Sequence, residues 1–154
     1  MYSLVYGNNL PHFLFIPKLI LNNSRNFMSY NFEVYQNDKI IFYSDGHWLH
    51  PIFEFEQFLE QTSLYPDLLK IKDKIIGRAA ALLLVRLGIR KIHARLLSEL
   101  GKDVLEHFDA QFTYEELVPQ IGCQTEDLLK KEYDPETAHR LILARIQNRK
   151  NDLV

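Results

Sequence analysis

The chain has 154 residues, of which 47% are hydrophobic and 25% are charged, and its formal net charge is −2. This length and composition are those of one globular domain with a real core, and they exclude a largely disordered chain. The balanced charge gives no basic surface of the kind that nucleic-acid-binding proteins carry. The single cysteine excludes an intrachain disulfide and a metal site built from several cysteines of one chain. We therefore expect a cytoplasmic protein in a reducing compartment.

Residues 1–30 differ from the rest because they are rich in aromatic residues and Asn and lack acidic residues. The apolar stretch 10–21 is interrupted by Pro11 and Pro17, follows no Lys or Arg, and is too short to span a bilayer. We expect an extension that packs on the domain 31–154 or on a partner subunit in a homodimer. Met28 is an alternative start, so the sequence leaves open whether residues 1–27 belong to the natural protein.

From residue 31 onward, strand and helix patterns alternate. Two β-rich runs, 32–35 and 40–43, flank the turn composition of residues 36–39 and predict a β-hairpin. Pro51 suits the first turn of a helix whose apolar residues recur at helical spacing. A short strand is predicted over residues 68–71.

The strongest pattern predicts a helix over Asp73–Leu87, with Asp73 as N-cap and Gly88 just beyond the C-terminus. Apolar residues surround this helix, so we expect it to be buried. Small residues at 77 and 79–81 should let it approach the sheet closely.

The remaining elements continue the alternation. We predict a strand over 90–94, a helix from the N-cap Ser98 through Phe108, a strand over 111–114, a short helix over 125–131 and a last helix opened by Asp134 and Pro135. The order β-β-α-β-α-β-α-β-α-α predicts an α/β fold with a mixed sheet, an antiparallel hairpin at one end and right-handed crossovers. Basic residues of the last helix are interpreted as a solvated face: Arg140, Arg145, Arg149 and Lys150.

Segment 73–83, which fits the pattern D-x-x-x-G-[KR]-A-A-A, and the stretch 114–121 resemble an uncharacterised family of bacterial and archaeal proteins. That family is catalogued as a domain of unknown function. The resemblance covers about Asn31 to Ile146 and implies a cytidine-deaminase-like fold, a three-layer α/β/α sandwich. It implies no established activity.

Zinc deaminase chemistry needs a His or Cys ligand near a catalytic Glu, and a C-x-x-C pair, to hold the metal that activates water. By topology these would lie at 73–78 and near Ser98, where the chain reads Asp-Lys-Ile-Ile-Gly-Arg and Leu-Leu-Ser-Glu-Leu-Gly. The six histidines show no ligand spacing, and one cysteine cannot form the pair. We therefore expect no zinc-dependent deaminase, no metal and no cofactor.

In open α/β sheets, ligands collect beyond the carboxyl ends of strands, at helix N-termini. Two predicted helices begin there. A guanidinium, free backbone N–H groups and a glycine in their first turns could hold a phosphate or a carboxylate. The same residues also have simpler structural roles, as helix caps and solvated side chains. The candidate ligand-binding residues are Asp73, Lys74, Gly77, Arg78, Ser98 and Glu99.

Cys123 directly precedes a predicted helix, where a thiolate is favoured, and with Glu126 forms a C-x-x-E stretch that we associate with the family. A catalytic cysteine needs a basic partner that the sequence does not name, so a buried inert thiol is the simpler interpretation. The candidate catalytic residues are Asp73, Cys123 and Glu126. Trp48 lines a pocket mouth or an interface, or it packs half-buried under the following helix, which is the commoner arrangement.

Three functions are compatible with these residues. The first is a zinc-free binder or enzyme that uses the N-terminus of helix 73–87 for a nucleotide-like or phosphorylated small molecule. The second is a catalytically silent domain for assembly, and the third is a thiol-dependent enzyme using Cys123. Whether the chain is an enzyme stays open. We expect neither a nucleic acid nor a membrane as a partner.

Overall fold

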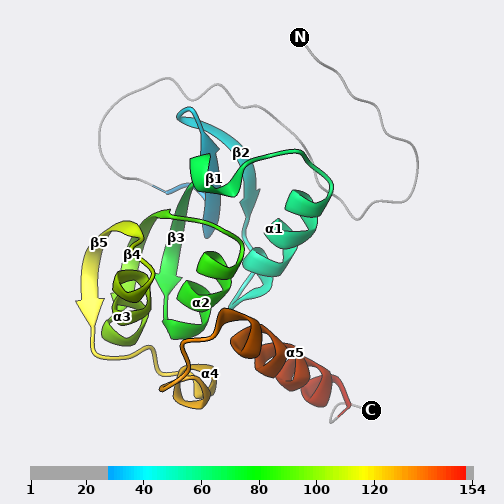
Figure 1. Ribbon diagram of the computed structural model, residues 1–154, viewed down its shortest axis with the longest axis vertical. Helices are drawn as coiled ribbons and strands as arrows, with labels where there is room; N and C mark the ends of the chain where they lie inside the picture. Colours follow the sequence, from blue (N-terminus) through cyan, green and yellow to red (C-terminus); the bar gives the residue numbers. More distant parts are fainter. Residues whose placement is uncertain (1–27, 152–154) are drawn as a thin grey trace.

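A five-stranded mixed sheet organises residues 28–151, which are the residues that the computed structural model describes (Figure 1). The strand order is β2-β1-β3-β4-β5; β1 is antiparallel to both neighbours, and β3, β4 and β5 are parallel. The predicted α/β class, element order and antiparallel hairpin are confirmed. The strands are β1 (Phe32–Gln36), β2 (Lys39–Ser44), β3 (Lys70–Ile76), β4 (Lys91–Ser98) and β5 (Gln111–Val118).

The helices fill the connections between these strands and follow the last one. They are α1 (His50–Glu60), α2 (Arg78–Arg86), α3 (Glu99–His107), α4 (Gln124–Leu128) and α5 (Pro135–Asn151), with a 3-10 turn over Pro66–Leu68. Ser98 is the N-cap of α3, as predicted, because its hydroxyl accepts the Gly101 N–H at 2.8 Å. Gly88 follows α2 with a φ of 85°, the left-handed conformation expected after a helix.

The helix predicted over Asp73–Leu87 begins five residues too early. Strand β3 continues to Ile76, since Ile75 and Ile76 pair with β4, and Gly77 is the N-cap of α2. The branched side chains of the two isoleucines suit a pleated strand, and the parallel pairing outweighs the helical spacing that starts at Ile76. Asp73 is therefore a strand residue near the carboxyl end of β3, and it caps no helix.

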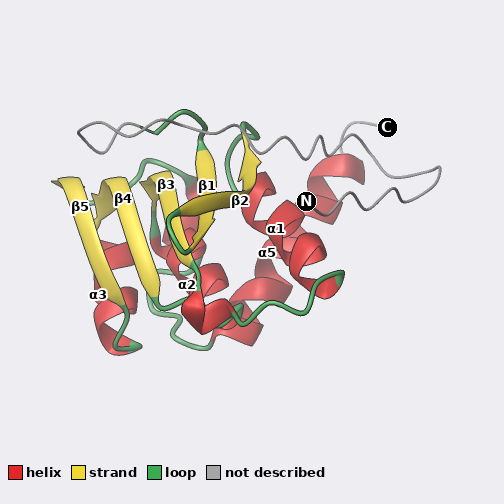
Figure 2. Ribbon diagram, turned by 90° about the horizontal axis from the view of Figure 1, so that it is seen from above, coloured by secondary structure: helices red, strands yellow, loops and turns green. Residues whose placement is uncertain are grey.

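Helix α2 is the centre of the core. Eight of its nine residues are buried, and α3 and α5 pack on either side of it (Figure 1). Seen along the sheet, α2 and α3 lie on the same side of the strands (Figure 2). Within residues 28–151 no helix covers β3, β4 and β5 on the opposite side, so the three-layer, cytidine-deaminase-like arrangement stays a prediction.

The expected N-terminal extension falls almost entirely on residues 1–27, which lie outside the described residues, so its packing stays a prediction. Among the described helices, none has the length and apolar character needed to cross a membrane.

Candidate functional site

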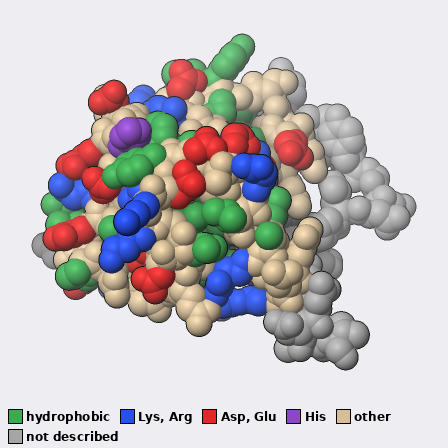
Figure 3. Space-filling view, turned by 60° about the horizontal axis from the view of Figure 1, so that its bottom comes forward, with side chains coloured by type: hydrophobic (Ala, Val, Ile, Leu, Met, Phe, Trp, Pro, Cys, Tyr) green, Lys and Arg blue, Asp and Glu red, His purple; other side chains and the backbone are tan. Residues whose placement is uncertain are grey.

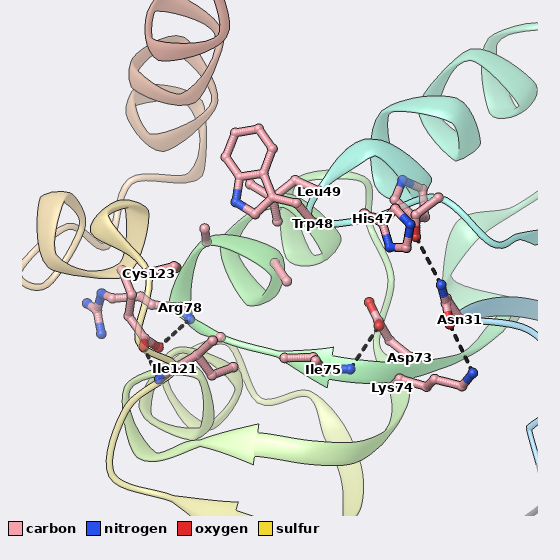
Figure 4. Close-up of a pocket in the computed structure, with 16 residues that line it drawn as sticks. Asn31, His47, Trp48, Leu49, Asp73, Lys74, Ile75, Arg78, Ile121 and Cys123 are labelled. Carbon is pink, nitrogen blue, oxygen red and sulfur yellow. Dashed lines mark hydrogen bonds between the residues drawn. The ribbon is translucent and has the colours of Figure 1, made fainter. Parts of the chain in front are cut away.

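A pocket of about 420 Å³ opens at the carboxyl end of β3 (Figure 4). This volume lies within the range of small-molecule sites. The pocket has three walls: the loop that precedes α1, the first turn of α2, and the segment that follows β5. Its lining includes Asn31, residues 46–49, residues 73–75 and 77–80, Ile121, Cys123 and Glu126.

Asp73 extends from β3 into this pocket (Figure 4). Its Oδ1 accepts the N–H of Ile75 at 3.1 Å. Burial raises the pKa of the Asp73 carboxyl from 3.8 to about 7, and the backbone hydrogen bonds offset only part of that rise. Near neutral pH this carboxyl therefore exists in both protonation states, which allows it to donate as well as to accept a hydrogen bond.

The raised pKa of Asp73 predicts how stability depends on pH. Between about pH 4 and pH 7 the folded protein holds a proton that the unfolded chain has released, so Asp73 makes the protein less stable as pH rises. Asp73→Asn should remove this decrease of the free energy of unfolding with rising pH. The variant should gain about 1–3 kcal/mol relative to the wild type between about pH 5 and pH 8, as measured by urea unfolding. A pH-independent difference between the two proteins would show that the carboxyl titrates normally.

Trp48 forms the aromatic wall of the pocket. Its backbone φ is 58°, a left-handed conformation that is unfavourable for a bulky side chain and is found mainly where the surroundings enforce it, often at functional sites. Its side chain is only partly covered, with 38% of the residue exposed. The sequence left open whether Trp48 lines a pocket mouth, and the structure confirms that it does.

The first turn of α2 supplies backbone donors to the same pocket. Gly77 as N-cap has no side chain to cap the helix, and Ala81 N–H already bonds the Gly77 carbonyl. Within residues 28–151, no hydrogen bond uses the N–H groups of Ala79 and Ala80, which line the pocket. Such first-turn N–H groups are ready to bond an acceptor.

Glu126 occupies the space between the N-termini of α2 and α3 and is only 1% exposed. Its Oε1 accepts the Arg78 N–H at 3.0 Å and the Ser98 hydroxyl at 2.5 Å, and its Oε2 accepts the N–H of Ile121. A Cβ on Gly77 would lie 3.1 Å from Oε1, so the glycine makes this close approach possible. The N-terminal charge of α2 is therefore already balanced by the protein's own carboxylate.

This arrangement also bears on the metal that a deaminase-like fold implies. Between the two helix starts the structure offers one carboxylate and one hydroxyl, which bond to each other and to backbone N–H groups. Zinc sites instead combine three or four His, Cys or acidic ligands. In the described part of the chain, no group of three or more His, Cys, Asp or Glu side chains could hold a metal ion. The residues present at this position do not fit zinc.

Arg78 lines the pocket only near its backbone, and its guanidinium extends away behind the wall (Figure 4). The side chain is fully buried. Its nitrogens donate to the carbonyl oxygens of Glu132 and Leu100 and reach Asp103, and the guanidinium lies 4.4 Å from the ring centre of Tyr133. Arg78 thus joins α2 to α3 and to the segment before α5. The predicted contact between its guanidinium and a ligand has no support in this geometry.

The other predicted site residues divide between the pocket and its surroundings. Cys123 is partly buried in the pocket wall and is the N-cap residue of α4. Lys74 lies at the rim, where its ammonium donates to Asn31 Oδ1 at 2.9 Å. Ser98 is buried beside Glu126, and Glu99 is exposed and does not line the pocket. The wall residues Asn31 and Ile121 were missed, since nothing local in the sequence connects them to β3.

The family described as Domain of unknown function (DUF1893) matches residues 26–143. A crystal structure of a DUF1893 family protein from Thermotoga maritima is similar with a TM-score of 0.66 and 24% sequence identity, over 75% of this chain and 80% of that chain. At this identity the likeness shows the fold alone. A search of curated proteins finds no match.

Proposed function

The chain belongs to the DUF1893 family, a domain of unknown function, and we propose that its pocket binds a planar heterocycle of the nucleobase type through Asp73. The observation that carries this proposal is the carboxyl group of Asp73 in a pocket that Trp48 also lines, and burial, which raises the pKa of that carboxyl to about 7, supports it.

The chemistry of Asp73 supports a ligand with an amide-like or amidine-like edge. A protonated carboxyl offers one donor and one acceptor, which match a ring nitrogen and a neighbouring N–H group. The ionised form offers two acceptors, which match two N–H donors, as when a carboxylate accepts from an amino group of a base. Ala79 and Ala80 line the same pocket, and because no hydrogen bond within residues 28–151 uses their N–H groups, these donors remain for a ring carbonyl of the proposed ligand.

Trp48 supports a flat ligand. Aromatic side chains bind bases by stacking, a contact worth about 1–3 kcal/mol per base that tolerates differences in sequence or substituents. The backbone of Trp48 is held in an unfavourable left-handed conformation, which fixes the ring at the pocket rather than in the core. Asp73 and Trp48 line the same pocket, so a planar ligand bound there has both a polar and an aromatic partner among the lining residues.

A ligand screen tests this proposal. Thermal unfolding is followed with a panel of nucleobases and nucleosides, and we expect at least one to raise the melting temperature, since a ligand bound only by the folded state stabilises it. Asp73→Ala should abolish the shift while remaining folded. The matched control is Asp67→Asn, which changes an exposed carboxyl of the 3-10 turn and should keep the full shift. No shift with any compound, or a full shift in Asp73→Ala, would refute the proposal.

Fewer observations support the two other functions that the sequence suggested, an assembly domain and a thiol-dependent enzyme. A silent assembly domain depends on the N-terminal segment, which is outside the described residues. A thiol enzyme has Cys123 in the pocket wall, yet no hydrogen bond within residues 28–151 joins this thiol to a basic side chain. We also propose that the protein forms a homodimer, because the aromatic N-terminal residues offer apolar surface to a partner subunit. We propose a cytoplasmic location because the chain has a single cysteine.

A further inference from the structure

Two arginines of α5 lie next to the side of the pocket that Trp48 forms. The guanidinium of Arg149 is 5.7 Å from the ring centre of Trp48. Arg145 donates from Nη2 to the Oε1 of Gln124, the residue that follows Cys123 of the pocket wall. Arg149 therefore contacts a residue that lines the ligand pocket, and Arg145 contacts the sequence neighbour of another lining residue. In Figure 4 the indole of Trp48 extends toward the α5 side of the pocket.

The arginines also line a hollow of their own between α4 and α5. This second cavity has a volume of about 420 Å³, and its lining includes Gln124, Leu128, Arg145 and Arg149. With the lower end of the molecule turned forward, basic side chains border a hollow in the surface (Figure 3). The hollow is large enough for a small charged group and adjoins the pocket through the neighbours Cys123 and Gln124.

The hydrogen bonding of Arg145 is incomplete, whereas Arg149 is exposed. The Nε of Arg145 is buried and has no hydrogen-bond partner, which is uncommon for a charged donor. Within residues 28–151, neither Arg145 nor Arg149 forms an ion pair with a carboxylate. Arg86 differs in this respect, because its guanidinium forms ion pairs with both Glu56 and Glu136. Arg145 and Arg149 thus bring two positive charges to the hollow without a carboxylate partner among the described residues.

We propose that Arg145 and Arg149 form a phosphate subsite, so that the ligand class of the pocket is a nucleoside monophosphate. This inference rests on the proposed function, because the ring would occupy the pocket at Asp73 and Trp48. Guanidinium groups bind phosphate through paired, charge-assisted hydrogen bonds, and the side chains of both arginines belong to the lining of the hollow. The sequence predicted that Arg78 contacts a phosphate, and we propose instead that the arginines of α5 do so.

Calorimetric titrations with matched pairs of nucleosides and their 5′-monophosphates test this subsite. Wild-type protein should bind a monophosphate about 10-fold to 100-fold more tightly than its nucleoside. In the double variant Arg145→Gln/Arg149→Gln the two affinities should become equal, with the nucleoside affinity retained. Arg140→Gln, which changes an exposed arginine of the same helix, should keep the preference. Urea unfolding of each variant confirms that the fold is intact.

The outcomes separate this inference from the proposed function. Equal affinity of the wild type for nucleoside and monophosphate would overturn the subsite and leave the pocket proposal standing. A preference for the monophosphate that persists in the double variant would also overturn the subsite, because the phosphate would then bind elsewhere. Absence of binding for every nucleoside and every monophosphate would overturn both.

Discussion

Arg78→Ala is expected to lower the free energy of unfolding by about 3–5 kcal/mol. The guanidinium is fully buried and donates to the carbonyl oxygens of Leu100 and Glu132, so its removal leaves both oxygens without this donor. The variant also loses the contact with the ring of Tyr133 and the ion pair with Asp103. Urea unfolding at neutral pH measures the difference.

Two comparisons make this result specific to the buried contacts. Arg78→Lys keeps the charge but cannot reproduce the fork of donors, so we expect it to recover only part of the stability. Arg140→Ala, at an exposed position of α5, should change the free energy of unfolding by less than about 0.5 kcal/mol. If Arg78→Ala were as stable as the wild type and lost only ligand affinity, the guanidinium would bind ligand and the structural role would be wrong.

Glu126→Ala is the second large effect that we expect, a loss of about 3–4 kcal/mol in the free energy of unfolding. The side chain accepts from Arg78 N–H, Ile121 N–H and the Ser98 hydroxyl, and all three donors would lose their partner inside the protein. Its removal also takes the negative charge away from the N-terminus of α2. Because Glu126 holds the segment that carries Ile121 and Cys123, the pocket wall should loosen as well.

Glu126→Gln separates the charge from the shape. The amide keeps one acceptor oxygen but turns an NH₂ group toward backbone donors, so we expect it to be less stable than the wild type and more stable than the alanine variant. Asp127→Asn changes the next, exposed residue of α4 and should have an effect below about 0.5 kcal/mol. Hydrogen exchange of the Arg78 and Ile121 amides should accelerate in Glu126→Ala; unchanged exchange and stability would contradict the network.

Much of the fold could be predicted because its signals are local. Asn37 and Asp38 adopt the left-handed φ values of 48° and 61° that a tight hairpin turn requires, and Asn and Asp are residue types that predict such a turn. Pro51 in the first turn of α1 and Ser98 as the cap of α3 are likewise readable from neighbouring residues. The predicted start of α2 was wrong because the strand residue Ile76 also fits the helical spacing. Only its pairing with β4 decides between helix and strand at this position.

The site could be predicted only in part, because its contacts join distant segments. Asp73 was a candidate for the wrong reason, as a helix cap, yet its strand position places it in the pocket. The partners of Arg78 are 22 to 54 positions away in the sequence, so no local pattern reveals that its guanidinium is already engaged. The backbone conformation of Trp48 has no sequence signal either, since left-handed tryptophan is rare.

The most direct test of the pocket proposal uses Trp48, the only tryptophan in the chain. Its indole N–H gives a single signal in a nitrogen–proton correlation spectrum, and this signal reports on the pocket wall without assignment of the other residues. Titration with the nucleoside that gives the largest thermal shift should move the indole signal to saturation in the wild type and leave it in place in Asp73→Ala. An indole signal that no nucleobase or nucleoside moves, or one that moves equally in Asp73→Ala, would contradict the account.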